Sequence, residues 1–168
     1  MEKYPGCDFH FAKTTSLNDR VSSVSVNIKY AGIGKNDLSA APGSSVTFYV
    51  QGCPHRCYGC HNPETWDFDG GKEIGEKEIA EDFRNRKLLD GITLSGGDPF
   101  FQQEACVELI NLLDGVNVWI YTGFEYDEIS ETELAKKANV LVVGKFIEDL
   151  KCDGQYFGSS NQKIIRRE

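Results

Sequence analysis

Three cysteines lie close together in one short segment of this chain, at Cys53, Cys57 and Cys60. The spacing C-x3-C-x2-C lets three thiolates converge on one inorganic centre, such as a four-iron cluster in which one iron keeps an open position. The alternative is a structural zinc ion with His61 as its fourth ligand. Structural zinc sites usually pair two C-x2-C units, and the sequence has no second one, so the spacing favours the cluster.

A second motif, Ser95-Gly96-Gly97-Asp98, follows the apolar run 91–94. Glycines let a backbone approach a ligand closely, and a carboxylate at Asp98 could accept a hydrogen bond from an ammonium group. An ordinary strand-to-helix turn would use the same residues, so the motif alone does not decide between the two. Together with the cysteines, it predicts a cluster whose open iron binds a small polar ligand held by a glycine turn.

The hydrophobic pattern predicts strands that alternate with helices along most of the chain. We expect strands at 21–30, 46–50, 92–94, 116–121 and 140–143, helices at 76–88, 101–113 and 131–138, and one more strand in the tail 155–167. Residues 1–20 should be irregular, and residues 31–45 should form a loop. This rhythm of strand, loop and helix indicates right-handed βαβ units and a parallel sheet.

About four parallel strands are too few for a closed eight-stranded barrel. We therefore expect the α/β class: an open, partial barrel of mostly parallel strands with an extra N-terminal strand, in one domain over 21–168. Ligand sites in such sheets lie at the carboxyl ends of the strands. The cysteines, the glycine turn, Thr122-Gly123 and Gly144-Lys145 each follow a predicted strand, so they should meet at one edge.

Composition limits the partners and the compartment. The net charge is −8, from 18 Lys and Arg against 26 Asp and Glu, which argues against nucleic acid because phosphate contacts need clustered cations. The first residues lack the apolar stretch of a signal peptide, and no apolar run approaches the ~20 residues that span a membrane. We therefore expect a cytoplasmic protein with reduced thiols and no membrane partner.

The cysteine loop, the glycine turn and their order resemble the radical S-adenosylmethionine (SAM) superfamily, and within it the activators of anaerobic (class III) ribonucleotide reductases. Five segments carry the resemblance: 51–66, 94–99, 119–123, 143–146 and 158–162. Two positions depart from common patterns. Gly59 stands where most radical SAM loops have an aromatic residue, although the reductase activators commonly have glycine there, and Val143 stands where that family often has aspartate.

The resemblance implies two cofactors, a [4Fe–4S] cluster held by Cys53, Cys57 and Cys60, and SAM bound at the open iron. Catalysis would then proceed through the cluster that these three cysteines hold. The residues that the resemblance places around SAM are Gly59, Cys60, His61, Ser95, Gly96, Gly97, Asp98, Thr122 and Lys145.

The activity that the resemblance implies is reductive cleavage of SAM, which generates a glycyl radical on anaerobic ribonucleotide reductase. The implied partners are that reductase, with its glycine loop as substrate, and an electron donor such as a flavodoxin. The nearest alternative is an activase of another glycyl radical enzyme, such as pyruvate formate-lyase, although those proteins are longer. An alternative of another class is a non-catalytic zinc-binding module, which metal analysis would recognise.

Other reactive side chains receive ordinary interpretations. Cys106 falls on the apolar face of a predicted helix, and we expect it in the core as a small hydrophobic residue. Cys7 and Cys152 are expected to be spare thiols. His55, inside the cysteine loop, has no evident partner in the sequence, and we expect it to be exposed and inert.

Overall fold

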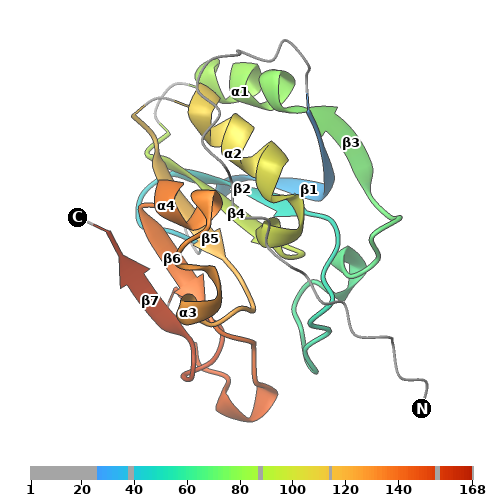
Figure 1. Cartoon of the computed structure of the whole chain (residues 1–168), viewed down its shortest axis with the longest axis vertical. Helices are drawn as coiled ribbons and strands as arrows, with labels where there is room; N and C mark the ends of the chain where they lie inside the picture. Colours follow the sequence, from blue (N-terminus) through green and yellow to red (C-terminus); the bar gives the residue numbers. More distant parts are fainter. Residues whose placement is uncertain (1–25, 38–39, 87–88, 114, 154–155, 168) are drawn as a thin grey trace.

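The computed structural model describes residues 26–37, 40–86, 89–113, 115–153 and 156–167. The expected irregular segment 1–20 and the first part of the expected strand 21–30 lie outside these residues. The described chain forms a mixed α/β structure built on one seven-stranded sheet that does not close on itself (Figure 1).

The sheet has the strand order β3-β1-β2-β4-β5-β6-β7. Its strands are β1 (Asn27–Asp37), β2 (Ser45–Val50), β3 (Lys72–Gly75), β4 (Gly91–Gly96), β5 (Asn117–Tyr121), β6 (Val140–Val143) and β7 (Lys163–Arg166). The central strands β2, β4, β5 and β6 run parallel to one another. Antiparallel pairs attach β1, β3 and β7 at the two sides, so the expectation of mostly parallel strands holds only for the centre of the sheet.

Helices cover one face of the sheet (Figure 1). They are α1 (Glu76–Arg84), α2 (Gln103–Leu112), α3 (Tyr126–Ile129) and α4 (Glu133–Lys137), with short 3₁₀ turns at Pro63–Thr65, Pro99–Gln102 and Glu148–Leu150. In α2, Ala105, Cys106 and Leu109 are buried, because residues three and four apart share one side of a helix. This face therefore holds the main apolar core.

Successive side chains along the central strands point to opposite faces of the sheet, and the two faces pack against different layers. In β5, Val118 and Ile120 join the core beneath the helices, whereas Trp119 belongs to a second, smaller cluster. The second cluster also contains Val140 and Val142 of β6, and irregular segments rather than helices pack against it. The helices and this thinner layer leave the carboxyl ends of the strands available for a site.

Two expectations about the edge of the sheet are wrong. The segment 31–45 is not a loop throughout, because β1 continues to its end at residue 37 and pairs with β2. Gly32 and Gly34 have little strand propensity, and the pairing with Tyr49 and Thr47 keeps them in the sheet. The edge strand β3 has no counterpart among the expected elements, and it pairs with the first residues of β1.

Most of the remaining elements overlap the expected ranges, but α3 has no counterpart among the expected helices. The expected extra N-terminal strand corresponds to β1, and the expected tail strand corresponds to β7. Helix α2 begins at Gln103, later than expected, because the 3₁₀ turn Pro99–Gln102 comes first. Within the described residues, the structure contains no helix with the length and apolar character needed to cross a membrane.

Candidate cluster and cofactor site

The residues expected to carry out chemistry gather at the carboxyl ends of β2, β4, β5 and β6. A cavity of about 210 Å³ opens there. The expected site residues in its lining are Cys53, Cys57, Cys60, His61, Ser95, Gly96, Gly97, Asp98 and Thr122. The parallel topology thus brings motifs that are far apart in the sequence to one place.

The two other expected site residues, Gly59 and Lys145, lie at the rim. Gly59 is exposed and packs against the Glu148 side chain, and its φ of +74° favours glycine. Lys145 is also exposed. Burial raises the pKa of the Cys57 thiol, and the positive charge of Lys145 opposes that rise, which places Lys145 near the cysteine loop.

The cysteine loop begins where β2 ends, and backbone hydrogen bonds anchor its first residues. The amide of Gly52 donates to the carbonyl of Thr65 at 2.7 Å, and the amide of Cys53 donates to that of Trp66 at 3.2 Å. Further along, Arg56 has a φ of 45°, a conformation that a non-glycine residue rarely adopts. The chain turns sharply at this point, within the segment that carries the cysteines.

Backbone amides interact with the sulfur atoms of the loop. The amide of Asn62 donates to Cys60 Sγ at 3.4 Å. Against the larger rise caused by burial, the amides of His55 and Arg56 lower the pKa of Cys53, and that of Phe146 lowers the pKa of Cys57. Hydrogen bonds to a thiolate favour its charged form, and hydrogen bonds to the sulfurs are one means by which proteins tune iron–sulfur clusters. These amides therefore offset part of the cost of forming thiolates in the loop.

The thiols nevertheless do not ionise easily on their own. Burial raises the pKa of Cys53 to about 11, and it raises the pKa of Cys57 as well. Because the thiolate is the form that binds metal, a bound cationic centre would have to supply the remaining stabilisation. Partial burial combined with backbone donors fits a group that brings positive charge into the loop.

The two alternatives, an iron–sulfur cluster and a single zinc ion, differ in how close together their ligands must lie. Among the described residues, no three His, Cys, Asp or Glu side chains lie close enough together to hold one metal ion. The His61 ring packs on the Phe146 ring, with 5.1 Å between their centroids. A cluster distributes its thiolates over several irons, so its ligands stand farther apart than those of a single zinc ion.

The glycine turn packs tightly against the start of the cysteine loop. The amide of Gly97 donates to the carbonyl of Val50 at 2.8 Å. A Cβ on Gly97 would lie 2.5 Å from the carbonyl oxygen of Gly52, and Gly96 has a φ of +91°. Close packing between protein segments is thus sufficient reason for both glycines, apart from any approach to a ligand.

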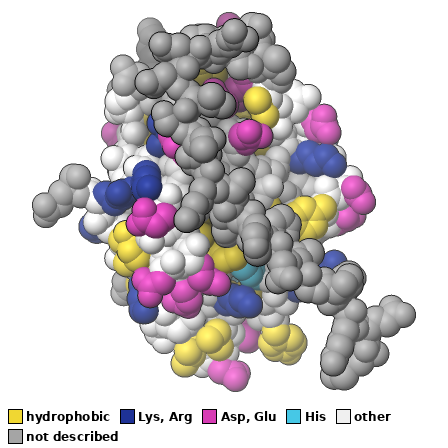
Figure 2. Space-filling view, in the orientation of Figure 1, with side chains coloured by type: hydrophobic (Ala, Val, Ile, Leu, Met, Phe, Trp, Pro, Cys, Tyr) yellow, Lys and Arg dark blue, Asp and Glu magenta, His cyan; other side chains and the backbone are white. Residues whose placement is uncertain are grey.

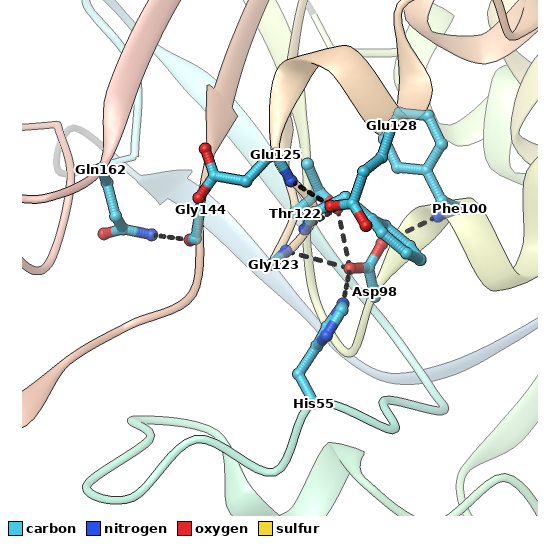
Figure 3. A network of polar contacts seen from close by, with 10 residues as sticks. His55, Asp98, Phe100, Thr122, Gly123, Glu125, Glu128, Gly144 and Gln162 are labelled. Carbon is cyan, nitrogen blue, oxygen red and sulfur yellow. Dashed lines mark hydrogen bonds and ion pairs between the residues drawn. The ribbon is translucent and has the colours of Figure 1, made fainter. Parts of the chain in front are cut away.

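Asp98 is the centre of a polar network (Figure 3). One carboxylate oxygen, Oδ1, accepts a hydrogen bond from the amide of Phe100 at 3.1 Å. The other, Oδ2, accepts from the hydroxyl of Thr122 at 2.8 Å and from the amide of Gly123 at 3.0 Å, and lies 2.7 Å from His55 Nε2. The carboxylate therefore joins the cysteine loop to the turns that follow β4 and β5.

The expectation that His55 is exposed and inert is wrong. Its side chain is only 9% exposed and contacts Asp98, whose side chain is 1% exposed. The two residues are 43 positions apart, and no local pattern in the sequence connects them. Only the approach of the cysteine loop to the edge of β4 brings them together.

The connection between β6 and β7 closes another side of the cavity. Gly144, Phe146, Gly158 and Gln162 all line it. The Gln162 amide nitrogen donates to the carbonyl of Gly144 at 2.8 Å (Figure 3), and its oxygen accepts from the amide of Gly158 at 2.9 Å. A single glutamine side chain thus ties the two ends of this connection together beside the cysteine loop.

Comparison with known proteins identifies the family. Residues 40–165 match the family described as 4Fe-4S single cluster domain. The anaerobic ribonucleoside-triphosphate reductase-activating protein of Salmonella typhi is 38% identical over 141 residues, which cover 76% of this chain and 92% of the relative. Proteins of the same name from Escherichia coli (strain K12) and Enterobacteria phage T4 are 34% and 30% identical, over 76% and 82% of this chain and 92% and 93% of their own lengths. The chain belongs to the anaerobic ribonucleoside-triphosphate reductase-activating protein family.

The family match includes the whole cavity, since the lining residues run from Cys53 to Gln162. The other cysteines lie elsewhere. Cys106 is fully buried in the core, as expected, and Cys152 is partly buried, with its amide bonded to the carbonyl of Gly158 at 3.1 Å. Cys7 lies outside the described residues. Among the described cysteines, only Cys53, Cys57 and Cys60 therefore line the cavity.

Proposed function

We propose that the chain cleaves SAM reductively at a [4Fe–4S] cluster and generates a glycyl radical on anaerobic ribonucleotide reductase. The observation that carries the proposal is the shared cavity, which Cys53, Cys57 and Cys60 line together with the glycine turn and Thr122. The 4Fe-4S family match and the names of the relatives support it.

In the proposed mechanism, one side of the cavity would hold the cluster and the other side would bind SAM. Cys53, Cys57 and Cys60 would hold the cluster through thiolates that backbone amides stabilise. Once bound and reduced, the cluster would supply the electron for reductive cleavage of SAM to methionine and a 5′-deoxyadenosyl radical. The residues that line the cavity would orient both groups.

The SAM side of the proposed site is the wall formed by the turns after β4 and β5. It consists of Ser95, Gly96, Gly97, Asp98 and Thr122, with Cys60 and His61 opposite and Gly59 and Lys145 at the rim. Four donors from the protein already engage the Asp98 carboxylate. The Asp98 carboxylate thus has its hydrogen bonds within the protein, and we infer that the amino acid portion of SAM contacts other atoms of this wall.

The open sheet suits a macromolecular substrate. We infer a partial barrel of the radical SAM type, in which the unclosed side leaves the carboxyl edge accessible from outside. A closed barrel of eight parallel strands would surround a small substrate, whereas a sheet with four central parallel strands does not. A glycine loop of the reductase could enter through that opening.

Exposed large hydrophobic side chains gather around the cysteine loop. Among the described residues they are Tyr58 (86% exposed), Phe68 (48%), Ile147 (42%) and Leu150 (42%). Tyr58 lies within the loop and Phe68 packs on Gly52 at its start, while Ile147 and Leu150 flank the residue that packs on Gly59. Figure 2 shows exposed hydrophobic groups at the lower end of the molecule, where these loops project in Figure 1. Such patches mark protein contacts, so we assign this rim to the reductase.

Anaerobic reconstitution tests the proposal at the level of the chain alone. We expect roughly four irons with matching acid-labile sulfide per chain. Addition of SAM and a reductant, chemical or a cytoplasmic flavodoxin, should then release 5′-deoxyadenosine. Stoichiometric zinc without sulfide would contradict the proposal and support a zinc-binding module. Production of 5′-deoxyadenosine with activation of pyruvate formate-lyase only would replace the proposed substrate by that enzyme.

A further inference from the structure

His55 lies between two of the proposed cluster ligands, two residues after Cys53 and two before Cys57. We propose that His55 is a positioning residue that latches the middle of the cysteine loop onto Asp98. The latch would fix the cluster ligands relative to the SAM side of the cavity. This consequence rests on the proposed function, whereas the latch itself is a property of the chain without any cofactor.

The first support is the bond itself. His55 Nε2 and Asp98 Oδ2 are 2.7 Å apart, and both side chains are withdrawn from solvent. A carboxylate can only accept, so the imidazole N–H donates. Hydrogen bonds to charged groups are roughly twice as strong as those between neutral partners, and burial protects this one from competition by water.

The second support is the slot around the imidazole. Its ring meets the Phe124 ring edge-on, with centroids 4.9 Å apart, and approaches the Phe101 ring at 6.2 Å. On another side, a Cβ on Gly123 would lie 2.5 Å from the ring carbon Cδ2 of His55. The turn after β5 therefore has glycine where the histidine needs room, and the ring has little freedom to choose another partner.

The third support is that the acceptor is held in place before His55 reaches it. Asp98 caps the 3₁₀ turn through Phe100, and Thr122 and Gly123 fix its second oxygen. At the base of the loop, the amide of Asp98 also donates to the carbonyl of Gly52 at 2.9 Å. The base of the loop is thus tied independently, and His55 adds the tie near its middle, adjacent to the sulfur ligands.

Two substitutions of similar size distinguish the contribution of the hydrogen bond to Asp98 from that of the side chain's volume. His55→Gln keeps a side-chain N–H that can reach the carboxylate, whereas His55→Leu fills the slot without a donor. In the unloaded protein, amide hydrogen exchange over residues 53–60 should rise about tenfold in His55→Leu and stay within about threefold of wild type in His55→Gln. Arg86→Ala, which breaks an exposed ion pair with Asp82 at 2.6 Å, is the control and should not change exchange there.

The consequence for the site is measured after reconstitution, by following the EPR spectrum of the reduced cluster as SAM is added. His55→Leu should raise the Kd for SAM about tenfold, at a thermal midpoint close to that of wild type, and His55→Gln should recover most of the affinity. Wild-type exchange in His55→Leu, or a His55→Gln variant as impaired as His55→Leu, would overturn the latch. A wild-type protein that ignores SAM would instead refute the proposed function, while the exchange experiment would still decide on the latch.

Discussion

The core cysteine Cys106 and the cysteines of the loop show how a ligand site differs from a hydrophobic core. Cys106 lies in α2 among apolar side chains, and burial raises the pKa of its thiol to about 12. Burial also raises the pKa of Cys53, to about 11, but there the backbone amides of His55 and Arg56 act in the opposite direction. Only the loop thiol has such donors and an adjacent cavity. Preorganised backbone dipoles beside an opening, and not burial alone, distinguish the candidate cluster site.

Replacing the loop cysteines should have the largest effect on the site, whereas replacing the core cysteine Cys106 should affect stability alone. Alanine at Cys53, Cys57 or Cys60 should abolish cluster binding and SAM cleavage, because two thiolates remain where three are needed. Cys106→Ala should retain full iron and sulfide, and should lower the free energy of unfolding by roughly 1–2 kcal/mol through a small cavity. Metal analysis and thermal unfolding check both. A cluster that persists without one loop thiol would break the comparison.

The glycine turn offers the next largest effect. Gly97→Val should destabilise the protein by roughly 1–3 kcal/mol, because its side chain would collide with the Gly52 and Val50 carbonyls. The cluster and the response to SAM should weaken together, since the clash displaces the base of the cysteine loop. Gly115→Ala is the control: it has a φ of +72° but open space around it, so only backbone strain of about 1 kcal/mol is expected. A Gly97→Val variant with normal cluster content and normal stability would refute the packing argument.

The exposed rim should separate SAM chemistry from recognition of the reductase. Tyr58→Ala removes the most exposed of the large hydrophobic side chains at the loop. It should reduce the yield of glycyl radical at limiting reductase about tenfold, as expected for an aromatic residue in an interface. Cleavage of SAM without the reductase should remain unchanged. Equal losses in both assays would mean that Tyr58 supports the site itself and not the docking of the reductase.

The smallest effect concerns pH. The Cys106 thiol has a raised pKa in the folded state, so its contribution to stability is complete below the unfolded value near 9 and is lost as the pH rises towards 12. Between pH 9 and pH 10, wild type should therefore lose up to about 1.4 kcal/mol more than Cys106→Ala. Denaturant unfolding of the cofactor-free protein at both pH values measures the difference. Parallel losses in the two proteins would contradict the assigned pKa shift.

Local patterns in the sequence predict a large part of this molecule. The cysteine spacing, the buried runs that become β4, β5 and β6, and the placement of each motif after a strand depend on neighbouring residues. Parallel strands then bring their carboxyl ends together, so the cavity follows from topology. The expected positions of the cysteine trio, the glycine turn and Thr122 in one cavity agree with the structure for this reason.

The features that the sequence does not predict depend on distant partners. The second half of β1 contains Gly32 and Gly34, which favour strands only when a neighbouring strand pairs with them. Likewise, β3 exists because β1 offers it a partner at the edge. The most consequential omission, the contact of His55 with Asp98, joins two segments that only the folded sheet brings together. The residues around His55 in the sequence do not indicate that its partner is Asp98.

The central claim is that this chain activates anaerobic ribonucleotide reductase through a radical reaction at the cysteine loop. The most direct test is EPR spectroscopy of the reductase after anaerobic incubation with the reconstituted chain, SAM and a reductant. We predict a glycyl-radical doublet on the reductase that requires SAM and is absent with the Cys57→Ala variant. No doublet on the reductase, with a doublet on pyruvate formate-lyase under the same conditions, would contradict the account.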